Sequence, residues 1–297
     1  MRKLLRVIFR RLMHLYKREH GRYSILTKLY YPYLAPRNGE REIIQLANGI
    51  NLNVDSNEYI QSLLYLFGDY ETSTVTLLGK ILNNGDTVID VGANIGYISL
   101  VCAKSVGVKG KVYSFEPDPK NFGYLSENIA LNESNNIQSY QLALSNKIGT
   151  LKLFHSKIDH NAGAHSMVYN ERVVSNDYVE IKAFKFDESE IQSQLIKIDL
   201  IKIDVEGVEM DVLEGMHNTI QKFKPILLIE ISAEYQNMRG LSVKGFKEYL
   251  LNTHGYNSYT ITNEGYLKES TLDQFHLLEN VVFVSTERFQ LIEEFRI

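Results

Sequence analysis

Residues 87–97 of the 297-residue chain read Thr-Val-Ile-Asp-Val-Gly-Ala-Asn-Ile-Gly-Tyr, and residues 112–117 read Val-Tyr-Ser-Phe-Glu-Pro. The first stretch predicts a short strand and then a helix, joined by a tight turn at Gly92 and Gly96 that leaves room for a ligand. Glu116 closes the second apolar run, where a carboxylate can accept hydrogen bonds from both hydroxyls of a ribose. This spacing is typical of a βαβ unit that binds a nucleoside.

The turn differs from one that binds a dinucleotide. A pyrophosphate turn follows the pattern Gly-x-Gly-x-x-Gly, whereas Asn94 occupies the middle position here. Asp90, ahead of the turn, would repel phosphates and attract a cationic amino group or a sulfonium. We therefore expect S-adenosylmethionine as the cofactor. The residues expected to bind it are Asp90, Gly92, Ala93, Asn94, Gly96, Glu116, Pro117 and Ala143, with the backbone near Ala143 beside the adenine.

Further blocks of sequence resemble one enzyme family. Residues 200–209 read Leu-Ile-Lys-Ile-Asp-Val-Glu-Gly-Val-Glu, and Pro-Ile-Leu-Leu-Ile-Glu follows at 225–230. Together with the glycine turn, these blocks resemble the FkbM family of S-adenosylmethionine-dependent methyltransferases over residues 66–232. The resemblance implies a class I methyltransferase fold. It also implies methylation of a hydroxyl on a sugar, a glycan or glycolipid, or a similar small acceptor.

The order of apolar patterns predicts an α/β fold. Strands alternate with helices after residue 86, which indicates a doubly wound, mostly parallel, Rossmann-like sheet of seven strands. We expect this core at 86–297, preceded at 43–85 by helices and a hairpin that turns at Asn48-Gly49. Residues 43–297 would then form one methyltransferase domain. A polar stretch at about 155–177, which carries His160, Gly163 and His165, is expected to form a lid on the acceptor side.

Residues 1–42 are expected to form a basic, helical N-terminal segment. Residues 1–20 carry seven Lys or Arg and one Glu, a net charge of +6, which leaves −10 for the rest of a chain whose total is −4. An acidic body disfavours a nucleic-acid partner. Helical spacing gathers apolar side chains on one face of this segment, namely Leu5, Ile8, Leu12, Leu15 and Tyr16.

A transit peptide is possible for this segment, because it is Arg-rich and acid-poor, and two further interpretations remain open. It either packs on the domain or on a second subunit of a homodimer with its arginines in solvent, or it lies in an anionic membrane surface. Its longest apolar run, Val7 to Phe9, is too short for a membrane span or a secretion signal. Cys102 is the only cysteine, which fits a reducing compartment. We therefore expect a cytoplasmic protein, either free or peripheral on the inner membrane surface.

Three residues are expected to carry the chemistry. Asp204 and Glu206 follow a core strand at its carboxyl end, where ligands bind in open α/β sheets. Either could be the general base that takes the proton of an acceptor hydroxyl, and both could instead hold a divalent metal ion. His165 is a rival base. Glu230 ends the next core strand and could face the same crevice. Glu206 could instead have only a structural role, in which its negative charge stabilises the positive N-terminus of the following helix.

Two other functions use the same features. A nicotinamide-dependent oxidoreductase would need the strand, the turn and the ribose-binding acid, but the third glycine of its turn is missing. A non-catalytic, nucleoside-binding scaffold at a membrane surface would not need the run from Asp204 to Gly207. A methyltransferase accounts for more of the sequence than either alternative.

Overall fold

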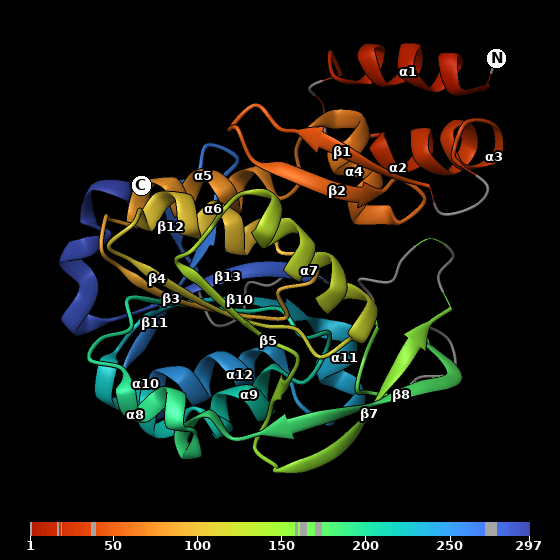
Figure 1. Ribbon diagram of the computed structural model, residues 1–297. Coiled ribbons are helices and arrows are strands. Elements are labelled where there is room, and N and C mark those ends of the chain that lie inside the picture. The colour runs from red at the N-terminus through yellow and green to blue at the C-terminus, as the bar shows by residue number, and fades with distance from the viewer. Residues whose placement is uncertain are drawn as a thin grey trace.

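A large sheet forms the centre of the molecule (Figure 1). The computed structural model describes residues 2–16, 18, 20–36, 40–157, 160, 165–169, 174–270 and 278–297. Eight strands follow one another across the sheet in the order β12-β11-β13-β10-β9-β3-β4-β5. Their bounds are β3 (Thr87–Val91), β4 (Lys111–Phe115), β5 (Ile137–Tyr140), β9 (Leu200–Ile203), β10 (Ile226–Ser232), β11 (Tyr256–Ile261), β12 (Leu267–Glu269) and β13 (Leu278–Ser285).

The strand directions identify the fold. β3, β4, β5, β9 and β10 pair in parallel, whereas β13 runs antiparallel to both β10 and β11. This order, with one reversed strand between β10 and β11, is the sheet of a class I methyltransferase, so the predicted fold class is confirmed. The predicted count of seven strands is one short. The additional strand is β12, which has three residues and is too short to show an alternating pattern.

Helices cover both faces of the sheet (Figure 1). Successive residues of β3 point to opposite sides, so that Val88 joins one apolar core while Ile89 joins the other. The helices on the first side are α5 (Thr72–Ile81), α6 (Tyr97–Val106) and α7 (Pro119–Leu131). Those on the other side include α8 (Glu190–Gln194), α9 (Glu209–Gly215), α10 (His217–Phe223), α11 (Ala233–Met238) and α12 (Val243–Tyr249). Burial on both faces explains the near-continuous apolar runs of the central strands.

A smaller three-stranded sheet lies beside the core. It consists of β6 (Ala143–Leu144), β8 (Val174–Phe184) and β7 (Gly149–Ser156), in that order. The expected lid at about 155–177 therefore begins and ends in strands. Between them, Ser166 forms an isolated antiparallel bridge with Phe154. Gly163 lies outside the described residues, so the lid remains a proposal.

The N-terminal part of the chain packs next to α6 and α7. It contains α1 (Arg2–Met13), α2 (Arg22–Ile25), α3 (Tyr31–Tyr33), β1 (Arg41–Gln45), β2 (Asn51–Asp55) and α4 (Tyr59–Phe67). β1 and β2 pair antiparallel with Gln45 opposite Asn51, which confirms the hairpin predicted around Asn48-Gly49. Among the described residues, no helix has both the length and the apolar composition that crossing a membrane requires.

Helix α1 packs with Arg6 and Arg10 inward, contrary to the expectation for a docked helix, whereas Arg11 is exposed. Arg6 is 4% exposed and its guanidinium donates to Glu42 at 2.7 Å, while the Arg10 guanidinium donates to the Tyr65 carbonyl at 2.9 Å. Because both guanidinium groups donate hydrogen bonds to these partners, the basic face can serve as the packing face. The apolar side chains that point into solvent instead are Leu4, Leu5, Val7, Ile8, Leu12 and Leu15.

Candidate active site

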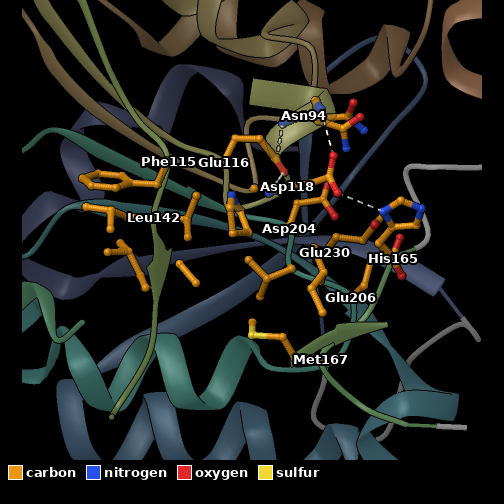
Figure 2. Close-up of a pocket in the computed structure, with 18 of the residues that line it drawn as sticks. Asn94, Phe115, Glu116, Asp118, Leu142, His165, Met167, Asp204, Glu206 and Glu230 are labelled. Carbon is orange, nitrogen blue, oxygen red and sulfur yellow. Dashed lines mark hydrogen bonds and ion pairs between the residues drawn. The ribbon is translucent and has the colours of Figure 1, made fainter. Parts of the chain in front are cut away.

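A pocket opens at the carboxyl ends of β3, β4, β9 and β10 (Figure 2). Its empty volume is about 710 Å³, a value that includes open solvent at the mouth. In Figure 2, apolar side chains lie toward one end, and carboxylates lie toward the other. The lining residues used below are Tyr70, Gly92, Asn94, Phe115, Glu116, Pro117, Asp118, Leu142, Ala143, Leu144, His165, Met167, Asp204, Glu206 and Glu230.

The two glycines of the turn are needed for close packing of the chain. Gly92 has φ of 82°, and a Cβ there would lie 1.8 Å from the carbonyl oxygen of Asp204. Gly96 has φ of 87°, and a Cβ there would lie 2.6 Å from Cδ1 of Leu125 in α7. Gly92 lines the pocket, and the two glycines also have a packing role. They let β9 and α7 approach the turn, which brings Asp204 beside it.

Asn94 and Glu116 are joined across the turn. Asn94 adopts a left-handed backbone conformation, with φ of 51°, and its N–H donates to Oε2 of Glu116 at 2.8 Å. The N–H of Asp118 donates to Oε1 of Glu116 at 2.9 Å. Burial raises the pKa of Glu116 to about 8, although the two backbone donors act in the opposite direction. Glu116 thus lines the pocket as an oriented carboxyl group that can gain or lose a proton near neutral pH.

The end of the pocket beyond Glu116 is lined by apolar side chains. Phe115 stacks on Tyr140 with ring centroids 5.1 Å apart, which fixes the orientation of the Phe115 ring. Ala143 and Pro117 line this end, as expected, together with Leu142 and Leu144. A planar heterocycle would meet apolar surface here, next to the carboxyl group of Glu116.

Three carboxyl groups gather at the opposite end. One oxygen from each of Asp204, Glu206 and Glu230 lies within 4.8 Å of the others. Burial alone would raise the pKa of Asp204, but the Lys202 ammonium, 2.8 Å away, holds that pKa below its usual value. Burial, followed by repulsion from Asp204, raises the pKa of Glu230 well above its usual range. Asp204 is therefore the ionised member of this carboxylate cluster.

Glu206 combines a perturbed pKa with a strained backbone. Burial, followed by the charges of Asp204 and Glu209, raises the pKa of Glu206 to about 8. Its φ of 52° is rare for a residue with a side chain, and such conformations cluster at functional sites. The Oγ of Ser166 donates to the Glu206 carbonyl at 2.6 Å, which ties the segment after β7 to the loop after β9.

Two expected cofactor residues line a smaller pocket behind the turn. Asp90 is fully buried, and its Oδ2 accepts a hydrogen bond from Ser99 at 2.5 Å. Asp90 and Ala93 line this smaller pocket with Glu71 and Lys202. Gly92, Asn94 and Asp204 line both pockets, so the two spaces adjoin each other along the turn. Gly96 lines neither of them.

His165 lies at the wall of the main pocket with its ring pointing toward Asp118 (Figure 2). The Nδ1 atom of His165 is 3.5 Å from Oδ2 of Asp118. Burial raises the pKa of Asp118, but His165 and backbone donors outweigh this effect and lower it. His165 is therefore near the pocket but paired with an acid outside the carboxylate cluster.

Sequence reasoning missed Glu71, Asp118 and Lys202. Lys202 carried a usable signal, because a lysine between buried apolar residues of a core strand must find a counter-charge. Asp118 reads as an ordinary helix cap before Pro119, and its side chain does accept from the Asn121 N–H at 2.9 Å. Only the fold shows that Asp118 also faces the pocket.

Comparison with known proteins identifies the family. The model of the methyltransferase FkbM domain matches residues 90–258. Hexuronic acid methyltransferase AglP of Haloferax volcanii is 31% identical over 163 residues, which cover 55% of this chain and 63% of that protein. 2-O-methyltransferase NoeI of Sinorhizobium fredii is 27% identical over 155 residues, which cover 48% of this chain and 63% of that protein.

The chain spans about six tenths of the length of these relatives. The crystal structure of methyltransferase FkbM from Methylobacillus flagellatus has a TM-score of 0.44 at 18% identity, and covers 68% of this chain and 44% of that one. The family model matches more than half of the chain. The chain therefore belongs to the methyltransferase FkbM domain family of S-adenosylmethionine-dependent methyltransferases.

Proposed function

We propose that this protein transfers a methyl group from S-adenosylmethionine to a hydroxyl of a sugar or glycan. One observation carries the proposal: a single pocket joins an apolar slot and the Glu116 carboxyl at one end to the carboxylate cluster at the other. The printed names of two relatives, a hexuronic acid methyltransferase and a 2-O-methyltransferase, support sugar hydroxyls as the acceptor class.

The residues of the pocket fit the adenosine part of this cofactor. Each oxygen of Glu116 accepts one backbone N–H, and a carboxylate oxygen has a second lone pair for a ribose hydroxyl. Phe115 and Leu142 supply apolar surface for the adenine. When bound, the cofactor supplies a methyl group that its sulfonium makes electrophilic.

The smaller pocket fits the amino-acid part. Oδ1 of Asp90 and Oε2 of Glu71 are buried oxygens for which no hydrogen-bond partner is found among the described residues. Buried acceptors without a partner are costly, and a cationic ammonium group would satisfy them. We assign Asp90 and Glu71 to the ammonium of the cofactor, with Gly92 and Asn94 between this group and the ribose.

Glu206 is assigned as the general base. A sugar hydroxyl becomes a good nucleophile as its proton leaves, and a base whose pKa lies near the working pH accelerates that step by roughly 10²–10⁴-fold. Glu206, with a pKa of about 8, meets this requirement, whereas the pairing with Lys202 makes Asp204 a weaker base. The ionised Asp204 instead orients the acceptor by accepting a hydrogen bond. A divalent metal ion held by Asp204, Glu206 and Glu230 is the competing assignment for the same oxygens.

The charges of the pocket favour an uncharged acceptor. No lysine or arginine is among the described residues that line the main pocket, and Lys202 behind it is already paired with Asp204. A uronic acid carboxylate would have no permanently cationic partner there and would face the carboxylate cluster, which costs free energy. We therefore propose a neutral, hydroxyl-rich sugar at the methylated position.

The assignment of Glu206 is tested by steady-state kinetics on the E206Q variant. We expect kcat to fall by about 10²-fold or more, with the affinity for S-adenosylhomocysteine within a few-fold of wild type. E180Q, a change at an exposed acid of β8, is the matched control and should keep full activity. Full activity of E206Q would remove Glu206 from the mechanism. Loss of wild-type activity with EDTA and its return with Mg²⁺ would assign the carboxylates to a metal ion instead.

We also propose that α1 contacts an anionic membrane surface. Its outward face exposes Leu4 by 65% and Leu12 by 56%, and Leu15, just after the helix, is 77% exposed. The exposed basic residues Lys3 and Arg11 flank this apolar face, so charge and apolarity together match an anionic lipid interface. A location at such a surface would bring the pocket close to lipid-linked sugars.

A further inference from the structure

A second group of side chains beside the pocket has the composition of a metal site. Asp118, His155 and His165 each offer one ligand atom, and these three atoms lie within 4.8 Å of one another. They come from three separate parts of the chain: the residue before α7, strand β7, and the segment between β7 and β8. None of the three has a part in the base and cofactor assignments above.

The backbone brings the two histidines together. Phe154 and Ser166 form an antiparallel bridge in which each N–H donates to the other carbonyl, at 2.9 and 3.1 Å. One residue further along, His155 lies opposite His165 as a non-hydrogen-bonded pair. In such pairs the side chains lie closer together than in hydrogen-bonded pairs. Their ring centroids are 4.9 Å apart. This proximity follows from backbone pairing and does not depend on side-chain rotation alone.

One atom of this group lacks a hydrogen-bond partner in the described structure. Nδ1 of His165 is buried and makes no hydrogen bond to a described residue. Oδ1 of Asp118 is held by the Asn121 N–H at the start of α7, which leaves Oδ2 facing Nδ1 of His165 at 3.5 Å. Two ligands on a tetrahedral zinc ion, with bonds of about 2.0–2.1 Å, lie about 3.4 Å apart. The observed separation therefore matches two ligands of one ion.

We propose that Asp118, His155 and His165 bind a divalent transition-metal ion of the zinc class. Two imidazoles and one carboxylate favour such an ion over Mg²⁺ or Ca²⁺, which prefer oxygen ligands. The Asn121 N–H orients the Asp118 carboxylate, as an outer partner of a metal ligand does. A three-ligand site keeps a fourth position for water or a substrate oxygen.

The position of this site suggests what the ion does. Asp118 and His165 both line the main pocket, and Asp118 donates its backbone N–H to Glu116. A bound ion would fasten the segment after β7 to the N-terminal end of α7, next to the ribose-binding acid. It would thereby order one wall of the pocket. The site differs from the oxygen-only cluster of Asp204, Glu206 and Glu230 in both ligands and location.

Cobalt(II) titration of the tag-free, full-length protein tests the proposal. After treatment with a chelator and dialysis, one equivalent of Co²⁺ should give visible absorption bands of a nitrogen-ligated, low-coordinate ion, and Zn²⁺ should displace it. H155Q and H165Q should each abolish the bands. D118N, which retains a capping side chain at the start of α7, should weaken Co²⁺ binding by at least tenfold.

The matched control is H217Q. His217 and His254 also have ring centroids 4.9 Å apart, but no carboxylate completes a metal-binding group with them among the described residues. H217Q and E206Q should keep the bands. A rise in the melting temperature with Zn²⁺, seen in wild type and absent in H155Q and H165Q variants with native circular dichroism, would support the same conclusion. Absence of the bands in wild type, or their survival in both histidine variants, would overturn the proposal, and so would their loss in H217Q. Neither cofactor nor acceptor is present, so the result is independent of methyl transfer.

Discussion

The affinity for adenosine-containing ligands should depend on pH through Glu116. Its pKa of about 8 in the ligand-free protein means that the carboxyl group is largely protonated at pH 6. Ribose hydroxyls donate hydrogen bonds to the ionised form, so binding must first release that proton. Each pH unit below 8 therefore weakens binding by up to about tenfold, or about 1.4 kcal/mol. Between pH 8 and pH 6 we expect the dissociation constant to rise by about fiftyfold.

Calorimetry with 5′-methylthioadenosine measures this effect cleanly. This ligand keeps the adenine and the ribose but lacks the amino-acid group, so its own ionisation does not contribute between pH 6 and pH 8. In E116Q the charge is absent, and we expect weaker binding by about 10²-fold at pH 8 with no dependence on pH. E206Q, altered at the other end of the pocket, should keep the wild-type pH dependence. Wild-type binding that stays constant from pH 6 to pH 8 would refute the reasoning.

Three other outcomes are expected. G92A should lose at least about 3 kcal/mol of unfolding free energy in denaturant titrations, because the new Cβ would overlap the Asp204 carbonyl oxygen and φ is positive; wild-type stability would contradict the packing role. The fold raises the pKa of Glu209 to about 7 and that of Glu116 to about 8, so the folded state binds more protons than the unfolded chain. The free energy of unfolding should therefore fall as the pH rises from 5 to 8. The expected fall is up to about 1.4 kcal/mol per pH unit for each group. A rise in stability over that range would contradict these shifts. The double variant I8E/L12E should lose co-sedimentation with anionic vesicles at low salt, whereas L291E, a change at another exposed leucine, should keep it; equal binding by both would exclude α1 as the contact.

The main sheet and the strand, turn and acid that line the pocket could be predicted from the sequence. Each central strand is buried on both faces and therefore reads as a short apolar run, and the turn at Gly92 needs a backbone conformation that few residues adopt. Glu116 comes directly after the second apolar run, so its position at the end of the neighbouring strand, beside the turn, could be predicted in the same way. These signals depend only on residues that are close together in the sequence, so they can be recognised without a structure.

Features that depend on distant contacts could not be predicted. The orientation of α1 depends on Glu42 and the Tyr65 carbonyl, which accept hydrogen bonds from Arg6 and Arg10 and so leave the leucines outside. The pairing of His155 with His165 depends on a bridge across a segment that has no alternating pattern. In both cases the sequence gives the identity of each residue, but it does not show which distant residue that side chain contacts.

Methyl transfer to a neutral sugar is the measurement that tests the central claim most directly. Purified protein would be incubated with S-adenosylmethionine labelled in its methyl group and with a panel of neutral glycosides and uronic acids, and the products analysed by mass spectrometry. The account predicts one labelled methyl group on an oxygen of a neutral glycoside, together with an equal amount of S-adenosylhomocysteine. Tight binding of S-adenosylmethionine with no labelled sugar from any member of the panel, or binding of NAD in its place, would contradict it.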